Sequence, residues 1–249
     1  MKRIALLAAL FCCALARAQT FVTSFEAHVT GTANPTITAA GLTAGDTLIV
    51  ATAIGGNAHA TGCSDSVAGE TVNLDYAPNP ISQNSVYRGE AFCSLVDIKT
   101  AGSHTITVAL NGPYNVQIYA LEVVLGTTPK FDQAPNLTNG ESASPISNSV
   151  TPTHYNSFLV ALLVSNTTGE TFSSWTNSFT ADNATTILPN SADAYLIQTT
   201  PTAVSAGATL SASDYWIAGV AVYYEGSASG ILLSGGSVVL IGGKPVIVP

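Results

Sequence analysis

The sequence predicts an all-β protein with a jelly-roll-like antiparallel β-sandwich built from two degenerate half-repeats. After residue 18 helical periodicity is almost absent. Short apolar or alternating runs rich in Val, Ile, Thr and Tyr recur instead, separated by clusters of Gly, Pro, Asn and Ser. Only 9% of the residues are charged, while Thr, Ser, Gly and Ala are abundant, a composition typical of extracellular β-proteins.

Residues 1–18 are expected to be a secretory signal peptide. The segment begins with Lys2 and Arg3, continues with an apolar run over residues 4–15, and ends in Ala16-Arg17-Ala18, which fits the small-x-small rule for cleavage. The run is too short for a stable membrane anchor. We therefore expect an exported protein, either secreted or at the cell surface.

Residues 19–226 are expected to form one β-sandwich domain. Its strands are predicted where apolar or alternating runs lie between turn residues. The predicted strands are Phe21–Thr30, Pro35–Ala39, Thr47–Ile54, Thr71–Tyr76, Tyr87–Val96, His104–Leu110, Val116–Leu125, Ser157–Val164, Phe172–Thr180, Ala192–Thr199, Ala208–Ser213 and Tyr215–Glu225. The polar stretch from Asp132 to Thr153 has no apolar pattern and is expected to connect the two halves.

Internal similarity supports the half-repeats. Three pairs of segments match: TLIVA (47–51) with SFLVA (157–161), TAGSHTITV (100–108) with SAGATLSAS (205–213), and VQIYALEVVLG (116–126) with WIAGVAVYYEG (216–226). The strand Tyr215–Glu225 is apolar on both faces, whereas a strand with one solvated face should alternate. We therefore expect loops, the C-terminal tail or another chain to cover its second face.

Short strand and turn motifs resemble those of a loosely defined class of bacterial secreted β-sandwich modules. These motifs are GDTLIVA (45–51), DSVAGET (65–71), TAGSHTITV (100–108) and LEVVLG (121–126). The resemblance implies an exported jelly-roll or immunoglobulin-like sandwich. It transfers no catalytic residue.

Residues 227–249 are expected to be a Gly/Ser spacer followed by an apolar β tail. Gly-Gly pairs at 235–236 and 242–243 separate three apolar segments, which predicts a small three-stranded meander. Internal glycines and Lys244-Pro245 argue against a membrane span in the mature chain. A small isolated sheet is marginal in water, so we expect residues 230–249 to cover the sandwich or to pair with another copy or an outer-surface assembly.

Charge limits the classes of partner. Removal of Lys2, Arg3 and Arg17 with the signal leaves four basic residues against 15 acidic ones, a net charge of −11. Such a surface repels phosphate backbones and anionic headgroups, so we expect no binding of nucleic acid or membrane surfaces.

The cysteines predict one disulfide. Cys63 and Cys93 are the two that remain after removal of the signal, and two cysteines in an oxidising compartment most simply pair. A redox or metal site is the alternative, but the chain has no CxxC motif.

The acidic segment DSVAGETVNLD (65–75) contains Asp65, Glu70 and Asp75. It is interpreted first as a hairpin turn, in which short polar side chains accept backbone N–H bonds. A calcium site formed by these three carboxylates is an alternative, and calcium is the one cofactor that the sequence suggests. A pair of hydrolase carboxylates is a further alternative.

Aromatic residues beside polar ones suggest a second function. Trp175 lies among Ser, Thr and Asn, where an exposed indole stacks on sugar rings, and Tyr76 and Tyr114 near loop boundaries are candidates to join it. The alternative is that Trp175 covers the sandwich core. Since GxSxG and HExxH are absent, we expect a non-catalytic structural or adhesive module. Glycan binding through Trp175 and a secreted hydrolase are the alternatives.

Overall fold

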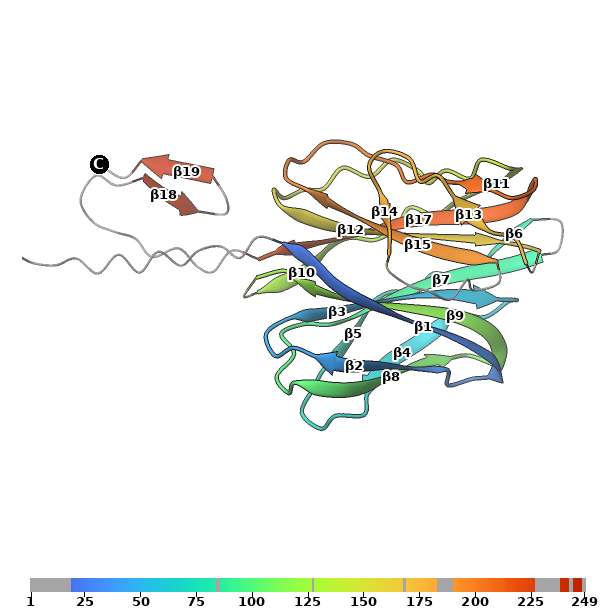
Figure 1. The fold of residues 1–249 in the computed structure, drawn as a ribbon, viewed down its shortest axis with the longest axis horizontal. Coiled ribbons are helices and arrows are strands. Elements are labelled where there is room, and N and C mark those ends of the chain that lie inside the picture. Colours follow the sequence, from blue (N-terminus) through green and yellow to red (C-terminus); the bar gives the residue numbers. More distant parts are fainter. Residues whose placement is uncertain are drawn as a thin grey trace, which may run out of the picture.

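The computed structural model describes residues 19–83, 86–126, 128–167, 169–182, 190–226, 238–241 and 244–247. Within these ranges the chain contains strands and no helix, so the all-β prediction is confirmed. The expected signal peptide, residues 1–18, lies outside the described residues. The strands form antiparallel sheets stacked as layers (Figure 1).

The first half of the chain forms a two-layer sandwich. Its larger sheet has the order β1-β9-β3-β7-β5, with β6 paired to β7, and its smaller sheet has the order β2-β8-β4. The strands of the larger sheet are β1 (Thr20–Thr32), β3 (Thr47–Gly55), β5 (Val72–Tyr76), β6 (Ile81–Gln83), β7 (Val86–Leu95) and β9 (Tyr114–Val124). Those of the smaller sheet are β2 (Thr36–Leu42), β4 (Ala60–Asp65) and β8 (Gly102–Leu110).

The second half repeats this plan. Its larger sheet has the order β10-β17-β12-β15-β14, with β11 also paired to β17, and a smaller sheet pairs β13 with β16. The strands are β10 (Pro129–Gln133), β11 (Thr138–Ser142), β12 (Ser157–Ser165), β13 (Phe172–Ser173), β14 (Thr180–Ala181), β15 (Ser191–Gln198), β16 (Thr209–Leu210) and β17 (Asp214–Glu225).

The predicted half-repeats occupy equivalent places. TLIVA lies in β3 and SFLVA in β12, the middle strands of the two larger sheets, and the third matched pair forms their neighbours β9 and β17. The second pair provides β8 and β16, which lie in the two smaller sheets. Weak similarity in sequence thus reflects a repeated topology.

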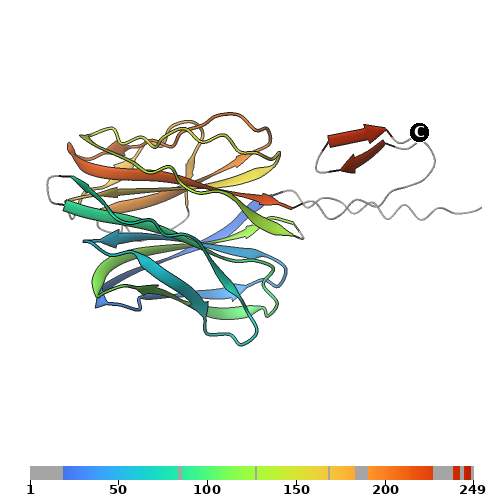
Figure 2. The same cartoon turned by 180° about the vertical axis from the view of Figure 1, so that it is seen from behind.

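The two larger sheets pack face to face, so the body has four layers (Figures 1 and 2). A central core fills the space between them, a first-half core lies beneath the sheet of β3, and a second-half core lies above the sheet of β12. Along β3, Leu48 and Val50 face the first-half core while Ile49 and Ala51 face the central core. A middle strand is therefore buried on both faces.

This stacking explains the doubly apolar strand β17. Ile217 and Tyr223 enter the central core, while Ala218 and Val220 enter the second-half core, as the alternation of the sequence indicates. The second face of β17 is covered by the other half of the same chain. A single two-layer sandwich has one core, whereas this chain builds three.

Polar edge strands account for most differences from the sequence prediction. The stretch 132–153 was expected to lack strands, but β10 and β11 pair with β17 there at the edge of the sheet. The predicted strand Phe172–Thr180 is instead two short strands, because Ser174, Asn177 and Ser178 adopt positive φ between them. β4 was missed because Gly62 and its polar neighbours carry no strand pattern.

The C-terminal tail contributes a hairpin. β18 (Val238–Ile241) pairs antiparallel with β19 (Lys244–Ile247), as expected for two strands joined by Gly-Gly. The spacer and the third predicted strand, residues 231–234, lie outside the described residues. The described part of the chain contains no helix long and apolar enough to cross a membrane.

Candidate functional site

A cavity of about 400 Å³ opens at one end of the central core, between the two halves. Gln117, Val164 and Asn190 form its buried base. Gln117 follows the central-core face of β9 and pairs in register with His28 on β1, which lies at the exposed rim. The apolar packing between the sheets therefore gives way to polar side chains at this end.

Two amides connect the halves at the base of the cavity. Gln117 Nε2 donates to Asn190 Oδ1 at 3.0 Å, and Asn190 Nδ2 donates to the carbonyl oxygen of Ser165 at 3.0 Å. These bonds use one of the two N–H groups and one of the two acceptor sites of the Asn190 amide. The base thus holds polar groups in fixed positions within the fold.

Tyr114 forms a wall of the cavity and is half-buried. Its ring lies against Gly56, where an added Cβ would approach ring carbon Cε1 to 2.4 Å, and against Gly112, where the same atom would lie 3.1 Å from Cε2. Gly56 also has a φ of +72°, which favours glycine. The two glycines leave the space that the ring occupies.

Arg88 contributes a charged group to the lining. Its Nη2 donates to the carbonyl oxygen and to the side-chain Oδ1 of Asn166, both at 2.9 Å, which ties β7 to the loop after β12. Burial lowers the pKa of Arg88, and the charge of Asp214 opposes that shift. Arg88 therefore holds the two halves together beside the cavity.

The three aromatic residues proposed for sugar stacking lie in different surroundings. Trp175 is half-buried against the second-half core, between β13 and β14. Tyr76 packs against the central core, and Tyr114 packs against the first-half core and lines the cavity. Of the three, Tyr114 is the one found in the lining of this cavity.

The three carboxylates proposed for calcium each have protein partners of their own. Asp65 Oδ2 contacts His104 Nδ1 at 2.5 Å, and Glu70 Oε1 accepts the backbone N–H groups of Lys99 and Thr100 at 2.9 Å. Asp75 accepts a hydrogen bond from a tyrosine of the second half. Among the described residues, no group of three or more His, Cys, Asp or Glu is placed to hold a metal ion.

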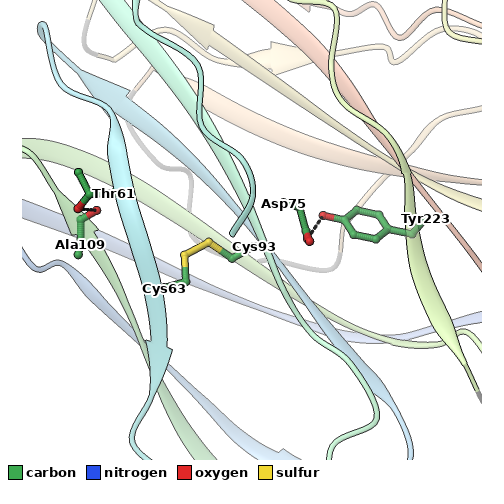
Figure 3. The surroundings of a disulfide bond; sticks show 6 residues. All are labelled: Thr61, Cys63, Asp75, Cys93, Ala109 and Tyr223. Carbon is green, nitrogen blue, oxygen red and sulfur yellow. Dashed lines mark hydrogen bonds between the residues drawn. A yellow bond between two sulfur atoms is a disulfide. The ribbon is translucent and has the colours of Figure 1, made fainter. Parts of the chain in front are cut away.

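The predicted pair Cys63–Cys93 is present as a disulfide (Figure 3). It joins β4 of the smaller sheet to β7 of the larger sheet, with Cα atoms 6.5 Å apart. Cys93 is buried in the first-half core and Cys63 packs against it. The disulfide therefore cross-links the two layers of the first half.

The interface between the halves also contains buried carboxyl groups. Burial raises the pKa of Glu90 well above its usual value, and neither of its oxygens has a hydrogen-bond partner among the described residues. Burial also raises the pKa of Asp193 well above its usual value, and the neighbouring Asp182 raises it further. Sequence reasoning singled out neither group, because each lies alone in an otherwise apolar or mixed strand.

Sequence reasoning also missed most of the cavity lining. Arg88, Gln117 and Asn190 are far apart along the chain and belong to no motif. A usable signal was the interruption of the apolar face of β9 by Gln117. No known family model matches the chain, and no curated protein is significantly similar to it.

Proposed function

We propose that the protein is an exported, non-catalytic β-sandwich module with a structural or adhesive role, whose C-terminal tail serves in assembly or surface association. The disulfide and the low content of charged residues support an extracellular location. The proposal depends mainly on the relation between the sandwich and the tail.

One observation carries the proposal: the four-layer body buries its own apolar strands without the tail. Both faces of β17 and β12 are covered by residues from the described parts of 19–226. A lid formed by the tail is not needed for this burial. The tail is therefore available for contacts outside the body.

The tail has the composition of an element that requires a partner. β18 and β19 carry apolar residues at every position except Lys244. A lone two-stranded hairpin is marginally stable in water and has unpaired edges that add strands from other chains. Pairing with a second copy or with an outer-surface assembly would satisfy both the apolar residues and the edges.

Light scattering of residues 19–249 and residues 19–229 tests this function. We expect the longer chain to associate and the shorter chain to be a monomer of equal thermal stability. Val239→Asp should abolish association because it places a charge in the hairpin, whereas Ser229→Asp adds the same charge to the spacer and should leave association intact. If both chains are monomers of equal solubility, the assembly role is wrong.

A further inference from the structure

The cavity between the halves has the size and placement of a small-molecule site. Its volume of about 400 Å³ falls within the range of ligand pockets, which is roughly 300–1,000 Å³. His28, Pro113 and Asn115 at the rim are exposed, while Gln117, Val164 and Asn190 at the base are buried. The cavity is therefore open to solvent at one end and shaped by the fold at the other.

We propose that this cavity binds a neutral sugar ring, with Tyr114 as its apolar wall and the amides of Asn115, Gln117 and Asn190 as hydrogen-bonding partners. A sugar presents a face of C–H groups and a perimeter of hydroxyls. An aromatic wall matches the first, and side-chain amides, which both donate and accept, match the second.

The aromatic wall is held in place before any sugar arrives. The ring of Tyr114 lies against Gly56 and Gly112 and packs on the first-half core, and a side chain at Gly56 would collide with it. The base is fixed as well, since Gln117 and Asn190 bond to each other at 3.0 Å. A site with positioned groups loses little conformational entropy when it binds.

Charge favours a neutral ligand over an anionic one. The chain without its expected signal carries a net charge of −11, which repels phosphates and carboxylates at long range. Arg88 is the cationic part of the lining, but it already donates to Asn166 and lies near Asp214. A neutral saccharide meets neither the repulsion nor the need to displace these contacts.

This site is independent of the tail and of Trp175. The lining comes from both halves of the body, whereas Trp175 packs against the second-half core. Failure of the assembly experiment therefore leaves this proposal untouched, and the reverse also holds. Tyr114 and Trp175 provide a matched pair of aromatic positions for a test.

A glycan microarray carrying neutral and uronic-acid-containing saccharides, probed with residues 19–249, is the first experiment. The neutral saccharide that gives the strongest signal is then titrated by calorimetry against the unchanged protein, Tyr114→Ala, Asn115→Ala and Trp175→Ala. We expect about tenfold or greater loss of affinity in Tyr114→Ala, a smaller loss in Asn115→Ala, and none in Trp175→Ala. Thermal unfolding of each variant identifies any that fails to fold.

Loss of binding in Trp175→Ala with retention in Tyr114→Ala places the sugar site elsewhere, and a blank array rejects a sugar ligand. Signals confined to uronic-acid saccharides reject a neutral one. If Tyr114→Ala does not fold, Tyr114→Leu replaces it, because leucine keeps bulk in the wall but has no aromatic ring. Unchanged affinity in Tyr114→Leu rejects the site.

Discussion

Tyr223 of the second half donates its hydroxyl to Asp75 Oδ2 of the first half at 3.1 Å, across the interface between the larger sheets (Figure 3). The two residues are separated by 148 positions in the chain. Burial raises the pKa of Asp75 from 3.8 to about 6, although the hydrogen bonds from Ser94 and Tyr223 lower it. The folded protein therefore binds a proton at Asp75 more tightly than the unfolded chain does.

This pKa shift predicts that stability falls as pH rises from about 4 to about 6. In that window Asp75 is ionised in the unfolded chain but still protonated in the folded protein, so each step in pH favours unfolding. A shift of this size corresponds to roughly 3 kcal/mol. We expect Asp75→Asn to remove this part of the pH dependence, as measured by urea unfolding at pH 4, 5, 6 and 7.

Tyr223→Phe is the matched variant for Asp75→Asn. It removes the hydrogen bond that lowers the pKa of Asp75, so the fall in stability should extend to higher pH than in the unchanged protein. If Asp75→Asn and the unchanged protein show the same pH profile, Asp75 titrates normally and the explanation is wrong.

A second prediction concerns Glu90, which lies at the interface between the two larger sheets. Its carboxyl is buried against Gly219, where an added Cβ would lie 2.6 Å from Oε2, and burial raises its pKa well above the usual value. A buried polar group without a hydrogen-bond partner costs roughly 1–3 kcal/mol, and an apolar side chain of similar volume removes that cost. We expect Glu90→Met to raise the free energy of unfolding at pH 8.

The gain from Glu90→Met should be smaller at pH 5. The raised pKa means that the unchanged protein loses stability as pH increases above the usual value of 4.5, while the Met variant does not. Unfolding curves at the two pH values measure the difference. A variant that is less stable at both would show that Glu90 makes a favourable contact in the folded protein.

A third prediction concerns His104 on β8 of the smaller sheet, whose protonation makes the stability of the protein depend on pH. Burial alone would lower the pKa of His104, but hydrogen bonds with Asp65 and with the carbonyl oxygen of Thr100 outweigh burial and raise it. The resulting stability is present in full below pH 6.5 and is lost as pH rises through the folded pKa. Asp65→Asn should therefore destabilise the protein at pH 5 much more than at pH 9.

NMR titration of the His104 ring checks the cause of this effect. We expect the midpoint in Asp65→Asn to move to lower pH than in the unchanged protein. His104→Gln removes the titrating group and should leave no further effect of Asp65→Asn on the pH profile. An unchanged midpoint would contradict the assigned partner.

The sequence indicated the middle strands well because burial on both faces leaves a strong pattern. β3, β12 and β17 carry apolar residues at most positions, and their faces follow the alternation directly. The second layer over β17 could not be identified, since an apolar face does not specify what covers it. The edge strands β10 and β11 were missed because pairing with β17, and not local composition, makes them strands.

The candidate site was accessible to sequence reasoning only through single residues. Tyr114 was identified from its loop position, but its companions Gln117 and Asn190 are separated by 73 positions and meet through packing of the two halves. The carboxylates at 65, 70 and 75 are close in sequence, yet they contact different partners. The hairpin expected for this segment is wrong, because the chain passes between Asp65 and Asp75 from β4 in the smaller sheet to β5 in the larger sheet, and these two strands do not pair with each other. Spacing along β-strands does not reveal contacts between sheets.

The disulfide gives the last prediction. Cys63–Cys93 joins β4 to β7 and closes a loop with a sequence separation of 30, which stabilises the folded state by roughly 3–4 kcal/mol in the chain-entropy model. We expect the double variant Cys63→Ala/Cys93→Ala to lose this amount of its free energy of unfolding, as measured by urea unfolding. Proteolysis should cut the smaller sheet β2-β8-β4 of the variant first, since the disulfide is its covalent link to β7. Mass spectrometry of the protein purified without a reductant should show one disulfide, which makes the chain two hydrogens lighter than the dithiol. Free thiols at both positions would contradict the oxidised state and, with it, the support that the disulfide gives to an extracellular location.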